Sequence, residues 1–349
     1  MAGTDTAVIR LSDLMHGQEA VCFAALVKKE RGTDKHGKPY VKCHFRDKRV
    51  TIVAPFWSSN ALREEAEGWT DGLAYRLHVK GDWTVKYGMQ LAVLSARLAR
   101  EEDADDGYDF FDLVKSSDHD PEQLFKTIHD LIQRYIDDPR LKQLVVSLLH
   151  DHGPLFKKMP AAQNFHHSYT AGLLEHVWSM ARIAGFLADH YAKYYHQLNP
   201  PLNKGVIVAA AILHDIGKLR ELDYHPVEAK YTKEGQLIGH VLIGRDLVHE
   251  AARKIAGFPE ETLLLLEHAI LSHHGKREFG APIVPLTLEA LLVSYIDDLD
   301  AKMNIAAGNR LESNTDGEFT DKVYALDNRR FYKGVPAELP ADDDVPGLP

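Results

Sequence analysis

The spacing of apolar and polar residues divides the chain into two differently patterned parts. Before residue 100, apolar positions alternate with polar ones or form short runs, and turn-forming residues separate them, as is typical of β-strands. A polar stretch at residues 60–67 predicts a short helix. We expect five strands, at residues 19–28, 40–46, 49–54, 73–80 and 90–98. Five strands with a helix between the third and the fourth predict an OB-fold barrel.

After an acidic, irregular stretch at residues 101–120, apolar residues recur at helical spacing. We expect helices from 121 to about 135, at 141–149, from 164 to about 195, at 206–213, after 240, at 261–271 and at 286–304. The tail carries turn residues, prolines and an acidic run, so we expect partial disorder. The predicted chain is multidomain: an all-β OB-fold at 1–104, a helical linker at 105–158 that packs on the next domain, an all-α domain at 159–312, and a tail at 313–349.

The predicted strands carry basic residues interleaved with aromatic ones. The candidates for contact with a nucleic acid are Tyr40, Lys42, Phe45, Arg46 and Trp83. Surfaces of this kind bind single strands, and each stacked base contributes roughly 1–3 kcal/mol. Residues 1–100 carry 16 Lys and Arg against 11 Asp and Glu, although the whole chain has a net charge of −10. The alternative is that most of these aromatic rings fill the barrel core.

Composition narrows the setting. The chain has 349 residues, of which 45% are hydrophobic, which is ordinary for a globular protein of two or three domains. No apolar run reaches membrane-spanning length, and the N-terminus lacks the features of a signal peptide. Cys22 and Cys43 are the only cysteines, which excludes a disulfide framework and argues against a cysteine-based zinc site. We expect a cytoplasmic protein that makes no membrane contact.

The most informative stretch joins an apolar run at 206–213 to the pair His214 and Asp215, with Lys218 following. The run has no turn residue, so we expect a buried helix, with these three side chains on one face. A buried carboxylate is unfavourable by several kcal/mol unless it is paired or binds a metal. The simpler alternative is a capped helix end, in which Asp215 and Lys218 form a surface ion pair and His214 is a core histidine.

Further residues with ligand chemistry recur on separate helical segments, mostly beside apolar neighbours. The full candidate set is His176, His214, Asp215, His240, His273, His274 and Asp297. Nitrogen and carboxylate ligands without sulfur suit Mn²⁺, Fe²⁺, Co²⁺, Ni²⁺ or Zn²⁺. One tetrahedral ion cannot bind this many ligands, so we expect two metals bridged by Asp215. Two such ions can hold a bridging hydroxide and clamp a phosphodiester, while Lys218 neutralises one of its oxygens.

This order of His, His-Asp, His, His-His and Asp resembles the HD superfamily of metal-dependent phosphohydrolases over residues 160–305. The resemblance implies an all-helical domain that hydrolyses a phosphoester. It also implies that His176 is the first ligand, that His214 and Asp215 form the signature pair, and that Asp297 is the last ligand. By the same resemblance, His240 completes the second ion's ligands together with one or both of His273 and His274.

Three longer segments resemble a narrower group, the YhaM-type 3′→5′ exoribonucleases, in which an OB-fold precedes the HD domain. The resemblance implies removal of nucleotides from the 3′ end of single-stranded RNA, with single-stranded DNA as a second candidate. It implies Mn²⁺ as the favoured ion, Co²⁺ as an alternative, and a homo-oligomer. The segments are His-His-Ser-Tyr-Thr-Ala-Gly-Leu-Leu-Glu-His at 166–176, Leu-Leu-Glu-His-Ala-Ile-Leu-Ser-His-His-Gly at 265–275, and Pro-Leu-Thr-Leu-Glu-Ala-Leu…Tyr-Ile-Asp-Asp-Leu-Asp-Ala-Lys-Met at 285–303.

Four more residues are candidates for contact with the substrate. His166 and His167 precede His176 and are interpreted as outer-shell groups, ligands of a third metal or contacts to the scissile phosphate, against a pair that bonds only the backbone. Lys276 and Arg277 are phosphate contacts or part of a solvated loop. Two other functions stay open: a nucleotide or cyclic-nucleotide phosphohydrolase, and a non-catalytic nucleic-acid-binding factor.

Overall fold

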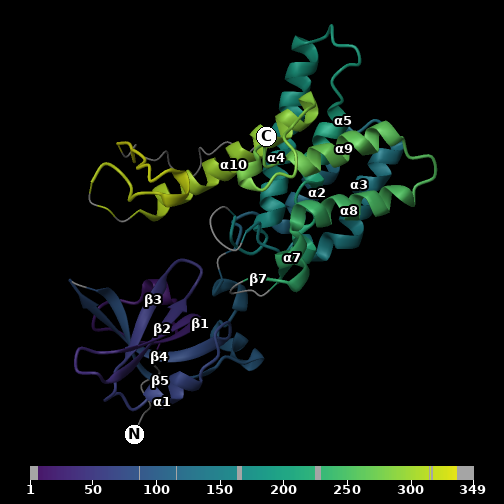
Figure 1. Cartoon of the computed structure of the whole chain (residues 1–349). Coiled ribbons are helices and arrows are strands. Elements are labelled where there is room, and N and C mark those ends of the chain that lie inside the picture. The colour runs from purple at the N-terminus through teal and green to yellow at the C-terminus, as the bar shows by residue number, and fades with distance from the viewer. Residues whose placement is uncertain are drawn as a thin grey trace, which may run out of the picture.

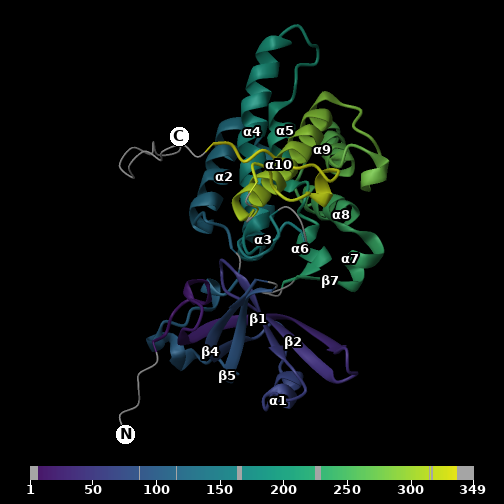
Figure 2. The same cartoon turned by 90° about the vertical axis from the view of Figure 1, so that its left-hand side faces the viewer.

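The computed structural model describes residues 7–85, 87–114, 116–162, 167–224, 229–313, 315 and 317–335, with the backbone alone at 111 and 312. It has two lobes, one built of long strands and one of helices (Figure 1). The view turned by 90° shows the same separation (Figure 2). None of the helices in these parts of the chain combines the length and the apolar composition that a membrane crossing requires.

The strand lobe is a closed five-stranded barrel, as predicted. Its strands are β1 (Glu19–Thr33), β2 (Pro39–Arg46), β3 (Thr51–Phe56), β4 (Ala74–Thr84) and β5 (Gly88–Leu98). Around the barrel they follow the order β1-β2-β3-β5-β4, and β3 pairs with β5 in parallel while the other pairs are antiparallel. The short helix α1 (Arg63–Gly68) lies between β3 and β4, so the barrel is an OB-fold.

Alternation along β2 decides which side chains face the core. Val41, Cys43 and Phe45 point inward and are at most 1% exposed, while Tyr40 and Lys42 lie on the outer face. Such alternation follows from the two-residue period of a strand. Phe45 packs edge-on against Trp69 inside the barrel. The expectation that Phe45 contacts a nucleic acid is therefore wrong, because its ring is part of the core.

The stretch after the barrel is more ordered than its acidic composition predicts. It forms 3₁₀ turns at Glu101–Asp106 and Phe110–Asp112. Arg97 on β5 makes two hydrogen bonds, of 2.6 and 2.8 Å, to the Asp103 carboxylate. These hydrogen bonds lower the pKa of Asp103 to about 2. The stretch reaches both lobes, since the Asp112 carbonyl accepts from the barrel and Ser117 N donates to the Thr170 carbonyl.

The helical lobe is organised around α5, whose residues 206–213 are all fully buried. This helix contacts α2, α3, α4, α9 and α10, and one apolar cluster runs through all six. The helices are α2 (Pro121–Tyr135), α3 (Pro139–Phe156), α4 (Gly172–Tyr194), α5 (Lys204–Leu213), α6 (Lys218–Glu221), α7 (Lys233–Ile238), α8 (His240–Arg253), α9 (Glu260–Ser272) and α10 (Leu288–Glu312). A small hairpin, β6 (Leu222–Asp223) and β7 (Lys230–Tyr231), separates α6 from α7.

Two helix boundaries near the predicted metal ligands differ from the prediction. Helix α4 begins at Gly172, because His167 and Ala171 have φ angles of 44° and 63° and form a tight turn instead. Helix α5 ends at Leu213, and turns at 214–217 separate it from α6. His214, Asp215 and Lys218 therefore lie at a break between two helices rather than along one helix.

The chain after α10 folds back on itself over residues 317–335, the described part of the tail. Phe319 pairs with Tyr332 as an isolated bridge, and their rings are in contact. Arg310 near the end of α10 donates a 2.6 Å hydrogen bond to the Lys333 carbonyl. This segment is thus anchored to α10, and residues 336–349 lie outside the described part.

Candidate metal centre

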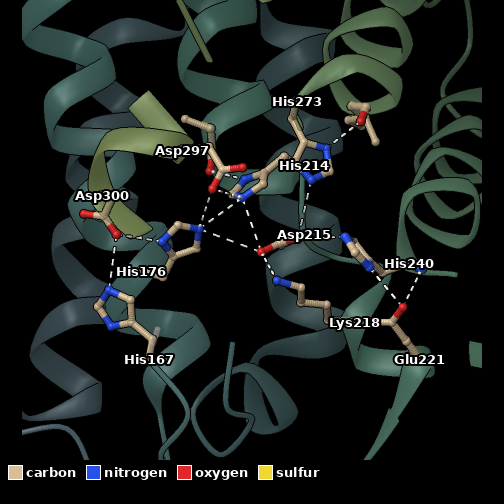
Figure 3. A network of polar contacts seen from close by, with 12 residues as sticks. His167, His176, His214, Asp215, Lys218, Glu221, His240, His273, Asp297 and Asp300 are labelled. Carbon is tan, nitrogen blue, oxygen red and sulfur yellow. Dashed lines mark hydrogen bonds and ion pairs between the residues drawn. The ribbon is translucent and has the colours of Figure 1, made fainter. Parts of the chain in front are cut away.

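All seven predicted ligands meet at one place inside the helical lobe. Asp215 lies at the centre, with His176 and Asp297 to one side of it and His240 to the other (Figure 3). Five helical elements supply them: His176 lies in the second turn of α4, His214 caps α5, His240 opens α8, His273 caps α9, and Asp297 lies within α10. Segments more than 120 residues apart in sequence therefore contribute to a single site.

The first ligand cluster consists of His176 Nε2, His214 Nε2, Asp297 Oδ1 and Asp215 Oδ2. His176 Nε2 lies 3.2 Å from His214 Nε2 and 3.3 Å from Asp297 Oδ1. His214 Nε2 lies 3.3 Å from Asp215 Oδ2. Two ligands that bind one ion at about 2.1 Å lie about 3–3.5 Å apart, so these separations fit a shared cation.

The second ligand cluster consists of Asp215 Oδ1, His240 Nε2, His273 Nε2 and His274 Nδ1. Among the described residues, these four atoms are buried and have no hydrogen-bond partner. Asp215 Oδ1 lies 3.5 Å from His240 Nε2 and 3.8 Å from His273 Nε2. A buried polar atom without a hydrogen-bond partner is unfavourable by about 1–3 kcal/mol. Four such atoms that converge on one point therefore indicate a common partner. A cation fits, because each atom can offer a lone pair.

Asp215 faces both clusters, one oxygen to each. Its carboxylate is 2% exposed, and Oδ2 also accepts a 2.6 Å hydrogen bond from Lys218 Nζ. Burial alone would raise the pKa of Asp215, but the nearby positive charges of Lys218 and His214 outweigh it and hold the pKa well below its usual value. A carboxylate that stays ionised at the centre of the site can bridge two cations.

The pKa values of three ligand histidines are shifted, upward for His176 and downward for His273 and His274. Burial opposes a charge on His176, but hydrogen bonds to Asp297 and Asp300 raise its pKa to about 9. Burial lowers the pKa of His273 well below its usual value, and it lowers that of His274 as well. A metal must therefore displace a proton from the first cluster, whereas His273 and His274 offer neutral rings.

Two buried carboxylates behind the ligands are absent from the predicted set. Asp300 on α10 accepts from His176 Nδ1 at 2.7 Å, and Glu221 on α6 accepts from His240 Nδ1 at 3.0 Å. A sequence signal exists for each: Asp300 lies three residues after Asp297, on the same helix face, and Glu221 lies three residues after Lys218. Asp298, one position after Asp297, is exposed and pairs with Lys302 instead.

The predicted substrate contacts of the helical lobe lie at different depths. His167 is 4% exposed and bonds Asp300 Oδ2 at 3.2 Å and Tyr169 OH at 2.8 Å, so it lies behind His176 rather than on the surface. Lys276 and Arg277 are exposed on the loop after the second ligand cluster. His166 lies outside the described residues.

The outer face of the barrel carries an aromatic pair, Tyr40 and Trp57. Trp57, directly after β3, is 47% exposed, and its ring lies 5.2 Å from that of Tyr40. The Tyr40 ring lies across β1 at Gly32, where a Cβ would be only 2.6 Å from the ring. Lys42 Nζ lies 5.4 Å from the Tyr40 ring. Gly32 therefore makes room for the Tyr40 ring, beside which Trp57 and Lys42 lie.

Two further predicted contacts lie elsewhere on the barrel. Arg46 is half-buried, and its Nε donates to Thr51 Oγ1 at 3.1 Å. Trp83, near the tip of the β4–β5 hairpin, is 51% exposed, and its backbone N donates to His16 Nδ1. Neither side chain belongs to the Tyr40–Trp57 surface.

The barrel and the helical ligand clusters define a protein that joins an OB-fold to an HD domain, and the HD domain family model matches residues 173–302. The chain is 35% identical over 323 residues to the 3′-5′ exoribonuclease YhaM of Geobacillus sp. (strain WCH70), covering 91% of this chain and 93% of that protein. It is also 35% identical over 320 residues to the YhaM of Bacillus pumilus (strain SAFR-032), covering 90% and 95%. The chain therefore belongs to the YhaM family.

Among solved structures, the second OB-fold domain of replication protein A from Methanococcus maripaludis is similar to part of the chain. It is 15% identical, with a TM-score of 0.21, and covers 27% of this chain and 96% of that one. At that TM-score the likeness adds nothing to the assignment, which depends on the barrel's own strand order.

Proposed function

We propose that this protein is a metal-dependent 3′→5′ exoribonuclease that acts on single-stranded RNA. The observation that carries the proposal is Asp215, whose two carboxylate oxygens each face a cluster of metal-ligand atoms. The relatives that match nearly the whole chain are named 3′-5′ exoribonucleases. The HD domain supports divalent metal binding, and the two clusters support two ions. Their nitrogen and carboxylate ligands suit Mn²⁺, Co²⁺, Fe²⁺, Ni²⁺ or Zn²⁺, and the resemblance to the YhaM-type enzymes favours Mn²⁺ among them.

The side chains divide the work of hydrolysis. When bound, two divalent ions supply an activated water and offset charge on the phosphodiester. Asp215 holds the two positions at a fixed separation because its rigid carboxylate faces both clusters. Lys218, 7% exposed and beside Asp215, keeps an ammonium group where charge develops on a phosphate oxygen. We expect Lys218→Ala to lower turnover while the metal content stays unchanged.

The barrel supplies affinity for the single strand. Tyr40 and Trp57 present two rings on its outer face, and Lys42 adds a positive charge beside them. Bases of any identity can stack on such rings, which suits an enzyme that must degrade varied sequences. Candidate contacts further along the RNA are Arg46, Trp83, Lys276 and Arg277.

End-labelled RNA tests the proposed activity. With Mn²⁺, a 5′-labelled oligonucleotide should give a ladder of shortening products, whereas a 3′-labelled one should release labelled mononucleotide at once. Asp215→Asn, which keeps the shape of the side chain, is the matched inactive control. Hydrolysis of mononucleotides alone would favour a nucleotide phosphohydrolase, and binding without cleavage in any divalent metal would favour a non-catalytic binding factor. An equal rate on DNA would extend the substrate to single-stranded DNA.

We further propose that the protein acts as a homo-oligomer. Large apolar side chains recur every three or four residues along α10 and are 42–68% exposed; they are Leu288, Leu291, Tyr295, Leu299 and Met303. All of them except Met303 border a cavity of about 400 Å³ between α10 and the end of α4. A contiguous row of exposed apolar side chains indicates an interaction surface. Leu291→Glu should lower the mass measured by light scattering, whereas Leu264→Glu, at an exposed apolar position on α9, should not.

The cytoplasm is the proposed location of the reaction. Cys22 and Cys43 are both buried and unpaired, which suits a reducing compartment. Burial raises the pKa of each thiol to about 12, so neither is a reactive thiolate.

A further inference from the structure

Four histidines of the metal centre are held in the same way. Each Nδ1 contacts an oxygen acceptor, so Nδ1 keeps a proton and Nε2 is the ring atom that can offer a lone pair to the ligand cluster. For His214 and His273, the acceptor is a backbone carbonyl three residues earlier on the same helix, at 3.0 and 2.6 Å. For His176 and His240, the acceptor is a buried carboxylate from another helix. Each ligand cluster contains one histidine of each kind.

Glu221 holds His240 by two contacts. Its Oε1 accepts from the backbone N of His240 at 2.9 Å and from the ring Nδ1 at 3.0 Å. Glu221 is 7% exposed, and its own carbonyl accepts from Thr232 N. His240 is the first residue of α8 and follows Gly239, whose φ is +80°. Because His240 is the first residue of α8, its backbone N–H has no acceptor within that helix, and Glu221 binds both this N–H and the ring.

Asp300 holds His176 from the opposite side of the site. One oxygen accepts from His176 Nδ1 at 2.7 Å and lies 3.2 Å from His167 Nε2, and the other accepts from the Ser179 hydroxyl. The backbone N of His167 in turn donates to Asn304 Oδ1 at 2.9 Å. Asp300 is 8% exposed. At these distances hydrogen bonds join Asp300 to His176 and His167.

We propose that Asp300 and Glu221 are positioning residues, each serving one metal: Asp300 the first ligand cluster and Glu221 the second. Neither faces the ligand atoms' meeting point, so each acts through its histidine by fixing the ring and strengthening its basicity. The inference rests on the two-metal function proposed above. It adds that the two sites are held by separate carboxylates and can be weakened separately.

Calorimetric titration of the metal-stripped full-length protein with Mn²⁺ tests this assignment. Glu221→Ala should weaken one of two binding equivalents by about 10–100-fold and leave the other unchanged. Asp300→Ala should weaken the other equivalent by a similar factor. Glu221→Gln and Asp300→Asn keep an acceptor oxygen and should restore part of the loss. Glu289→Gln is the matched control, because Glu289 is also buried but accepts from Asn203 N away from the site.

Ligand variants identify which equivalent is affected. The His240→Ala background removes a ligand of the second cluster. In that background Glu221→Ala should have no further effect on Mn²⁺ affinity, whereas Asp300→Ala should lower the affinity for the ion that still binds. Carboxylate variants that leave both equivalents intact, or weaken both equally, would overturn the positioning assignment alone. A wild-type protein that binds a single equivalent would instead overturn the two-metal proposal, so the two failures are distinguishable.

Discussion

A single methyl group at Gly217 tests how tightly the second ligand cluster is held. Gly217 lies in the turn between Asp215 and Lys218, where α6 packs against the start of α8. A Cβ at this position would lie 2.0 Å from the His240 carbonyl oxygen and 2.6 Å from Gly244 N. Ordinary contact begins at 3.4 Å, so α8 would have to move by about 1.4 Å, and both obstacles are backbone atoms that cannot rotate away.

The magnitude follows from that displacement. Overpacking of this kind destabilises a protein by about 1–3 kcal/mol, and a clash with two backbone atoms of α8 places Gly217→Ala at about 3 kcal/mol. Metal–ligand distances tolerate changes of about 0.2 Å, so a shift of His240 by more than 1 Å should also remove it as a ligand. We therefore expect both a less stable helical lobe and the loss of one Mn²⁺ equivalent.

Gly308→Ala is the matched control. Gly308 also lies in a helical segment, but no atom lies within 4 Å of a Cβ built there. Its replacement should stabilise α10 by about 0.5–1 kcal/mol, because alanine loses less conformational entropy in a helix. Urea unfolding of the metal-stripped variants, followed by far-ultraviolet circular dichroism, gives the stabilities, and calorimetry gives the metal content. Gly217→Ala that matches the wild type in both measurements would refute the packing argument.

Three further predictions test the site and the barrel. Asp215→Asn should lose turnover and most bound Mn²⁺ while the circular dichroism spectrum is unchanged, and activity near that of the wild type would exclude the bridging role. Because hydrogen bonds to carboxylates raise the pKa of His176 to about 9 despite its burial, apparent affinity for the first ion should increase from pH 7 and level off above pH 9. Calorimetry at pH 7 should then count about one proton released on binding, and none released would contradict this. Trp57→Ala should weaken RNA binding by about 1–3 kcal/mol without changing the melting temperature, whereas Phe45→Ala should destabilise the barrel by about 3–5 kcal/mol; the reverse pattern would place the binding surface elsewhere.

Periodicity and residue chemistry alone determined much of this protein. Alternation in the first hundred residues predicted the strands and the helix of the OB-fold, because a strand's two-residue period is written directly into its side-chain pattern. Histidine and aspartate at helix ends beside apolar runs indicated a metal centre, since a core tolerates such groups only with a partner. The segment at 206–213 could be recognised as a buried helix because its apolar run contains no turn residue.

Only the tertiary structure decided which groups face one another. Sequence gives no distance between residues far apart in the chain, so it could not assign one oxygen of Asp215 to each cluster or join Glu221 to His240. Phe45 alternates in phase with Val41 and Cys43, so its inward position follows the strand period, whereas the exposure of Trp57, directly after β3, was decided by packing. Burial and contact depend on how elements pack in three dimensions, and local patterns describe only the elements themselves.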